Sequence, residues 1–346
     1  METQINAPKN NLKMETLNME IKNTAPVLTN LLQIVESGLL SENIYLTLID
    51  ENLNQFSSGL RINKLGVTEA PLPEILKLLG VRSITLNASH DFTALLKLSV
   101  TLPPAQVEQY LWTFFKNETV IAELRSLFSN CRTIAFDDWA AITGASNLWN
   151  GLLADVIRPL DKKDLEFIFY LGDPGNKLSF QVDEAIDLIS EFSHHGQVTF
   201  ALDASEAMKL WMVLNGVNPD TPVEGQTPSD LNKKYFSIFR TMDVSRLLIY
   251  SADNAILFSR NQQFVLSRKK VEHHIEIGAD ARQNFIAGFS IGLLKHLDIA
   301  HCIALGLIVF GCCGESNTKP DQQGLLLYIR NWINDLQKPE SLHLYE

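Results

Sequence analysis

The middle of the chain alternates between short apolar segments and longer amphipathic segments, and this rhythm limits the folds open to it. The apolar segments are rich in branched and aromatic residues, as β-strands are: Glu166–Leu171, Gln197–Leu202 and Arg246–Tyr250. The intervening segments carry apolar residues at helical spacing: 182–192, 206–214 and 229–242. The apolar runs are too continuous for strands with one wet face, so we expect parallel neighbours in a sheet covered by helices on both faces. The expected fold class is a three-layer α/β fold with a central, mostly parallel sheet.

Weaker patterns extend this scheme toward both ends of the chain. Further expected strands are Arg82–Leu86, Arg132–Phe136 and a hairpin of Ala255–Phe258 with Gln263–Leu266 at the sheet edge. Further expected helices are Gln106–Phe115, Asn284–His296, Ile299–Cys312 and Ile329–Leu336. The segment Ile299–Cys313 is apolar on all sides but shorter than the roughly 20 apolar residues that span a bilayer. We therefore expect a core helix that packs on Asn284–Leu297.

Length and composition suit a large globular protein. The 346 residues are 46% hydrophobic, and the net charge of -11 opposes binding to the phosphates of nucleic acids. The first 25 residues are polar, lack the apolar stretch of a secretion signal and are expected to form a flexible leader. Residues 26–346 are expected to form one α/β domain, whose part up to residue 130 leaves room for a small lid. The four cysteines show no C-x-x-C spacing, so we expect buried thiols and a cytoplasmic location.

Three segments carry a resemblance to a known family. Asn284–Leu294 (NFIAGFSIGLL) resembles the helix that follows the G-A-G-D motif of ribokinase-type (PfkB) carbohydrate kinases. Gln197–Ala207 is similar to the family's strand leading into an N-x-x-E motif, and Phe167–Pro174 resembles the preceding strand, which ends in Asp-Pro. Order and spacing agree with the family over residues 130–338, whereas the Gly-Gly-x-x-x-N sugar-contacting signature is not found before residue 130. The resemblance implies a ribokinase-like fold and ATP-dependent phosphoryl transfer to a sugar or nucleoside.

The catalytic signature of that family is rewritten in this chain. In the family, the glycines of G-A-G-D let backbone N–H groups approach the transferring phosphate, and the Asp accepts the proton of the sugar hydroxyl. Here Asp280-Ala281-Arg282-Gln283 occupies the four positions, and an amide such as that of Gln283 cannot accept a proton at neutral pH. The resemblance assigns phosphate or nucleotide binding to Ala281, Arg282 and Asn284, with Gln283 at the degenerate base position.

Acidic residues at strand ends complete the candidate site. The N-x-x-E position reads D-A-S-E, so the resemblance assigns Asp203 and Glu206 to Mg²⁺ and its waters. Asp173 in the retained Asp-Pro, together with Asp137 and Asp138, marks a candidate substrate or phosphate region. Asp137 and Asp138 fit a helix N-cap equally well. Histidines and cysteines lack metal-ligand spacing, so no tightly bound metal is expected.

The rewritten signature predicts a ribokinase/PfkB-like sugar kinase homologue with impaired or lost phosphoryl transfer. One alternative is an active sugar or nucleoside kinase whose base is Asp280, about one helical turn before Gln283. Another is a non-catalytic ligand-binding or interaction module on the same fold. Mg²⁺ and ATP are the expected cofactors of an active enzyme, and none is expected otherwise. The expected partners are a small sugar or nucleoside and a nucleotide, with a homodimer left open and with neither nucleic acid nor membrane.

Overall fold

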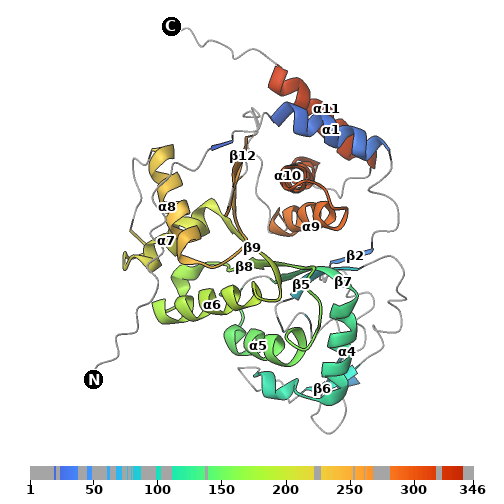
Figure 1. Cartoon of the computed structure of the whole chain (residues 1–346), viewed down its shortest axis with the longest axis vertical. Coiled ribbons are helices and arrows are strands. Elements are labelled where there is room, and N and C mark those ends of the chain that lie inside the picture. Colours follow the sequence, from blue (N-terminus) through green and yellow to red (C-terminus); the bar gives the residue numbers. More distant parts are fainter. Residues whose placement is uncertain are drawn as a thin grey trace, which may run out of the picture.

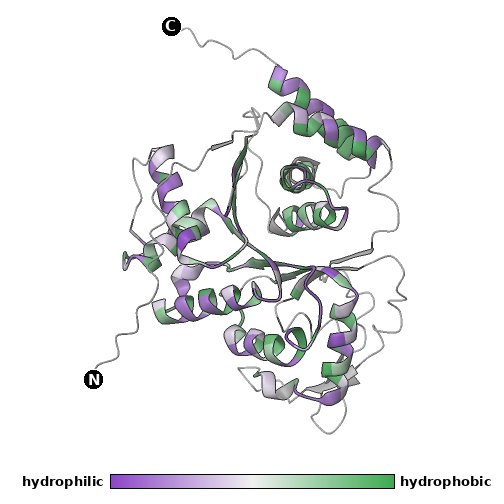
Figure 2. Cartoon of the chain, in the orientation of Figure 1, coloured by the Kyte–Doolittle hydropathy of each residue, from purple (hydrophilic) through white to green (hydrophobic). Residues whose placement is uncertain are grey.

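A twisted β-sheet lies between two layers of helices in the computed structural model of the chain (Figure 1). The structure describes residues 19–20, 24–37, 45–48, 61–62, 68–71, 76, 79, 81–86, 99–102, 111–136, 139–221, 227–251, 254–260, 262–267, 281–316 and 322–337. Hydrophobic residues are prominent on the strands and on the helices in contact with them (Figure 2). Each face of the sheet therefore has a core of its own.

The main sheet comprises nine strands among the described residues. Their order across the sheet is β1 (Met19–Glu20), β12 (Gln263–Ser267), β11 (Asn254–Ser259), β10 (Arg246–Tyr250), β9 (Gly196–Asp203), β8 (Leu165–Tyr170), β7 (Cys131–Phe136), β5 (Val81–Leu86) and β2 (Tyr45–Leu48). The strands β8, β9 and β10 are parallel neighbours, as predicted, and β7 extends the parallel centre by one strand. Antiparallel strands flank them on both sides, so the sheet is mixed with a parallel centre.

The expected hairpin is confirmed as the antiparallel pair β11 and β12. It does not form the edge of the sheet, because β1 pairs in parallel with β12 through Met19 and Glu20. These two residues lie within the segment that the sequence predicts as a leader, and helix α1 begins in the same segment at Thr24. The N-terminal segment thus contributes to the main sheet and to one helical layer.

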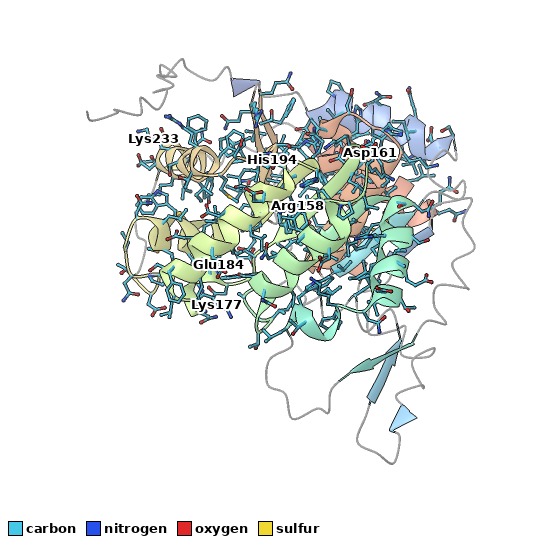
Figure 3. All side chains as sticks on the ribbon, turned by 60° about the horizontal axis from the view of Figure 1, so that its bottom comes forward. Arg158, Asp161, Lys177, Glu184, His194 and Lys233 are labelled. Atoms are coloured by element: carbon cyan, nitrogen blue, oxygen red, sulfur yellow. The ribbon has the colours of Figure 1, made fainter. Side chains whose placement is uncertain are left out.

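A second, antiparallel sheet projects from the main body (Figure 3). Its strands are β3 (Arg61–Ile62), β4 (Thr68–Pro71) and β6 (Ser99–Leu102). It lies in the part of the chain for which the sequence leaves room for a lid. The expected helix 106–115 falls mostly outside the described residues, and its end forms the 3-10 turn η2 (Trp112–Phe114). The Trp112 ring packs so closely on Gly151 that a Cβ has no room there, which anchors this turn on the main body.

The two helical layers bury alternate residues of the strands. One layer contains α4 (Glu118–Ser129), α5 (Ala145–Leu152), the π-helical η3 (Leu153–Ile157), α6 (Ser179–Phe192), α7 (Ala204–Leu214) and α8 (Pro228–Thr241). The other layer contains α1 (Thr24–Glu36), α9 (Ala281–Leu294), α10 (Ile299–Ser316) and α11 (Gln322–Gln337). Along β8, Phe167 and Phe169 belong to the first core, and Ile168 and Tyr170 belong to the second. Burial on both faces explains the unbroken apolar sequence of this strand.

Helix α10 is the expected core helix. It packs along α9, and α1 and α11 cover it from outside (Figure 1). The backbones of α9 and α10 approach closely, since a Cβ at Gly288 would lie 2.5 Å from the carbonyl oxygen of Leu305. Among the described helices, none has both the length and the apolar character needed to cross a bilayer. Three thiols are buried and that of Cys313 is half-buried.

Several helices begin earlier than the sequence pattern indicates, and α11 differs most. Helix α11 begins at Gln322 instead of Ile329, and the Gln322 amide donates a hydrogen bond of 2.9 Å to the carbonyl oxygen of Val35 on α1. This contact supports a first turn that has no apolar periodicity. Helix α9 begins at Ala281, three residues before the expected start, so most of the rewritten motif is helical.

Candidate functional site

The carboxyl edge of the parallel strands brings several candidate residues together. Asp203 is the last residue of β9, and Asp173 lies in the loop after β8. The Cα partner of Asp203 on β10 is Tyr250, the last residue of that strand. The Tyr250 ring stacks on Phe285 of α9, with 4.6 Å between ring centroids and 6° between planes. The start of α9 therefore lies at the same edge as Asp203, where open α/β sheets hold ligands.

Asp203 and Glu206 form a reciprocal capping box at the start of α7. The Glu206 backbone N–H donates to Oδ1 of Asp203 over 2.7 Å, and the Asp203 N–H donates to Oε2 of Glu206 over 3.0 Å. The D-x-x-E spacing is itself a capping signal. Each carboxylate thus has one oxygen engaged by the backbone, whatever else it binds.

Asp173 is held by the backbone on one side and by a lysine on the other. Its Oδ1 accepts a hydrogen bond of 2.9 Å from the Gly175 N–H and caps the short 3-10 turn η4 (Pro174–Asn176). Its Oδ2 accepts a hydrogen bond of 2.5 Å from Nζ of Lys209 on α7. Gly172 precedes this turn with a φ of 75°, a left-handed conformation that glycine adopts at low cost. The Asp173 carboxylate is therefore oriented before any ligand arrives.

Lys209 is a site residue that the sequence interpretation missed. Its hydrogen bond to Asp173 raises the pKa of the Lys209 ammonium group above its ordinary value, against the opposing effect of burial. The charges of Asp173, Asp220 and Asp203 raise it further. The sequence did contain a signal that could have identified Lys209. It follows Asp203 and Glu206 at intervals of three residues, a spacing that places side chains on one side of a helix.

The described carboxylates do not gather as ligands of a divalent cation. Within the described ranges, no three side chains of His, Cys, Asp or Glu are arranged to hold a metal ion. Asp203 and Glu206 turn oxygens toward backbone amides, and Asp173 turns one toward an ammonium group. The Mg²⁺ role that the resemblance assigns to Asp203 and Glu206 stays a prediction, and it would depend on the second oxygen of each carboxylate and on waters around the ion.

The rewritten motif lies at the N-terminus of α9. Ala281, Arg282 and Gln283 belong to its first turn, where the backbone N–H groups lack intrahelical partners and can face an anion. No acidic residue is present in that turn. Asn284 is half-buried. Three further candidates, Asp280, Asp137 and Asp138, lie outside the described residues, as do the side chains of residues 281–283.

The loops after β7 and β8 are tied to one another beside this site. The Ala140 N–H donates a hydrogen bond of 2.9 Å to the carbonyl oxygen of Leu171. Lys177 extends over the Trp139 ring, with Nζ 5.5 Å from the ring centroid. Figure 3 shows Lys177 before the start of α6 and His194 beyond its other end. The two loops therefore form one connected rim, to which Lys177 contributes a second positive charge.

No protein-family model matches the chain, and no curated protein matches it. Solved structures are similar to it at 12–13% identity. They include Arabidopsis thaliana ribokinase complexed with ribose and ATP, which is 12% identical, covers 62% of this chain and 59% of its own, and has a TM-score of 0.43. Ribokinase from Thermotoga maritima is 13% identical, with coverages of 60% and 59% and a TM-score of 0.40. A Burkholderia thailandensis nucleoside kinase in complex with inosine is 12% identical, with coverages of 68% and 65% and a TM-score of 0.41. This chain thus spans less than two thirds of the length of each.

Proposed function

We propose that this chain is a divergent homologue of the ribokinase-type (PfkB) sugar kinases in which phosphoryl transfer is lost or strongly reduced. The resemblance of three segments supports the homology, and the mixed α/β sheet supports the location of the site. Asp173, Asp203 and the start of α9 share the carboxyl edge of that sheet. The ligand bound there is a small sugar or nucleoside, together with a nucleotide where the site still accepts one.

The main observation behind the proposed loss of activity is the set of residues in the first turn of α9. This turn contains Arg282 and Gln283 and no acidic residue. A general base contributes roughly 10²–10⁴ to a rate, and one anion-hole donor roughly 10²–10³. The two losses need not multiply, because such groups act as a unit. Replacing both still predicts turnover far below that of an intact kinase.

The test is ATP consumption against a panel of sugars and nucleosides. We expect no turnover from the natural protein. The matched variant restores the family motif through Asp280→Gly, Arg282→Gly and Gln283→Asp, and we expect it to regain turnover. Robust turnover by the natural protein would contradict the proposal.

A second candidate function is an active kinase that uses Asp280 as its base. In the sequence Asp280 stands three residues before Gln283, and it lies outside the described residues. In that case Asp280→Asn would abolish turnover by the natural protein. Three helical residues span roughly 4.5 Å, whereas a misplacement of about 1 Å can already cost a hundredfold in rate. This mismatch makes the inactive homologue the preferred proposal.

Ligand binding is tested separately by a thermal-shift screen. A molecule that binds only the native state raises the melting temperature by mass action. We expect at least one sugar or nucleoside to raise it, and Asp173→Asn to reduce that shift. Asp187→Asn is the matched control, since Asp187 is exposed in the middle of α6. Equal shifts in both variants would place the ligand elsewhere.

A further inference from the structure

We infer that the ammonium group of Lys209 is the resident cation of the carboxyl edge and opposes the binding of a divalent ion there. The inference deepens the proposed function and rests on it, since it concerns the same edge. It concerns how the acidic residues of the edge are neutralised, and it makes no claim about turnover.

The positions of the charges are the first argument. Nζ of Lys209 lies 2.5 Å from Oδ2 of Asp173. The carboxylates of Asp220 and Asp203 lie near enough to attract the same ammonium group. These three carboxylates come from three segments: the loop after β8, the turn after α7 and the N-cap of α7. One lysine therefore serves as counter-charge to acidic groups that the fold brings together from separate parts of the chain.

The orientation of the two partners is the second argument. A helical side chain leans toward the N-terminus of its helix, so Lys209 is directed back toward the first turn of α7. Asp173 is fixed by the Gly175 N–H, and Gly175 itself lies against Pro219. About a third of each charged side chain is exposed, 35% for Lys209 and 38% for Asp173. The two charged groups are thus directed toward one another and remain within reach of solutes.

The consequence concerns divalent cations. An ion that approached Asp173 would meet a like charge already at hydrogen-bond distance from that carboxylate, and Asp203 and Glu206 are engaged in the capping box. Divalent cations should therefore bind the natural protein weakly at this edge. Their affinity should rise once the charge of Lys209 is removed and the carboxylates keep theirs.

The experiment is a titration with Mn²⁺, in which electron paramagnetic resonance measures the free ion. We expect Lys209→Met to bind one additional Mn²⁺ at least about threefold more tightly than the natural protein does, because the variant removes a like charge from beside Asp173 while solvent screens part of its effect. Adding Asp173→Asn to that variant should abolish the gain. Lys234→Met is the matched control, because it also removes one lysine charge, from a side chain that lies over the Trp211 ring on α8 and α7. It should bind Mn²⁺ as the natural protein does.

Lys209→Arg and Lys209→Gln complete the set. Lys209→Arg keeps the positive charge and should leave the Mn²⁺ affinity unchanged. Lys209→Gln is a second neutral variant, which replaces Lys209→Met if that protein does not fold. Tight Mn²⁺ binding by the natural protein that Asp173→Asn removes would overturn the inference. So would neutral variants that bind Mn²⁺ no better than the natural protein. Because the readout is metal affinity, these outcomes are independent of ATP consumption and of the ligand screen.

Discussion

At the start of α7, Asp203 and Glu206 each accept a hydrogen bond from the backbone N–H of the other. The N-terminal N–H groups of a helix have no intrahelical acceptor, and a side chain at the N-cap supplies one. The two residues therefore have a structural role, beside any role in binding a ligand. The two roles can be separated, because asparagine keeps the acceptor oxygen of aspartate and loses its charge.

Asp203→Ala is expected to lower the free energy of unfolding by about 1 kcal/mol, the usual cost of losing an N-cap. Asp203→Asn should cost only a few tenths of that, since asparagine caps a helix about as well as aspartate. Urea denaturation followed by circular dichroism measures both. Equal losses in the two variants would mean that the charge of Asp203, and not its cap, stabilises this helix.

The helix pair α9 and α10 shows how close packing depends on glycine. A Cβ at Gly288 would lie 2.5 Å from the carbonyl oxygen of Leu305 and 2.9 Å from the Cα of Gly306. Both atoms belong to the backbone, so no side chain can move aside to make room. The two helices would have to separate.

Gly288→Ala is therefore expected to reduce stability by about 1–3 kcal/mol, as overpacking of a core does. Ser290→Ala on the same helix is the control. The Ser290 side chain is fully buried, and its hydroxyl has no hydrogen-bond partner among the described residues, so its removal should be neutral or stabilising. Thermal or urea unfolding distinguishes the two. A Gly288→Ala protein as stable as the natural one would contradict the close approach of these helices.

The loss of stability caused by a charged side chain should differ between positions of helix α10. Leu305 is 1% exposed, whereas Val309 is half-buried. Leu305→Asp would bury a carboxylate without a partner and should cost several kcal/mol, about 3 or more. Val309→Asp should cost less, because its carboxylate can reach water. Comparable unfolding midpoints for the two variants would contradict the placement of Leu305 in the core.

At the scale of the whole molecule, the architecture could be predicted where burial leaves a trace in the sequence. The continuous apolar run of β8 predicts a strand covered on both faces, and the uniformly apolar α10 predicts a core helix. The Asp173–Lys209 pair could not be predicted, because its members are 36 residues apart and meet only in the folded chain. The early start of α11 is likewise accompanied by a contact with α1. Within the candidate site, the resemblance predicts Asp203 and Glu206 as Mg²⁺-associated residues, and the hydrogen bonds show the capping box that their D-x-x-E spacing also indicates.

The N-terminal segment offers the broadest test, because the sequence predicts a leader up to residue 25, whereas the structure begins α1 within that segment, at Thr24. Helix α1 packs on α10 and α11, with Leu28 fully buried, and the Arg330 guanidinium lies 2.7 Å from Glu36. Leu28→Ala should therefore cost about 2–5 kcal/mol, as large-to-small substitutions in a core do. Leu327→Ala is the matched control, since that leucine of α11 is 60% exposed, and it should cost less than about 0.5 kcal/mol. Urea unfolding of the whole chain measures both losses when it is followed by tryptophan fluorescence, to which Trp332 contributes from the second core and the other four tryptophans from the first. A Leu28→Ala protein with the stability of the natural one would mean that α1 is an appendage and that the second layer ends at α10 and α11.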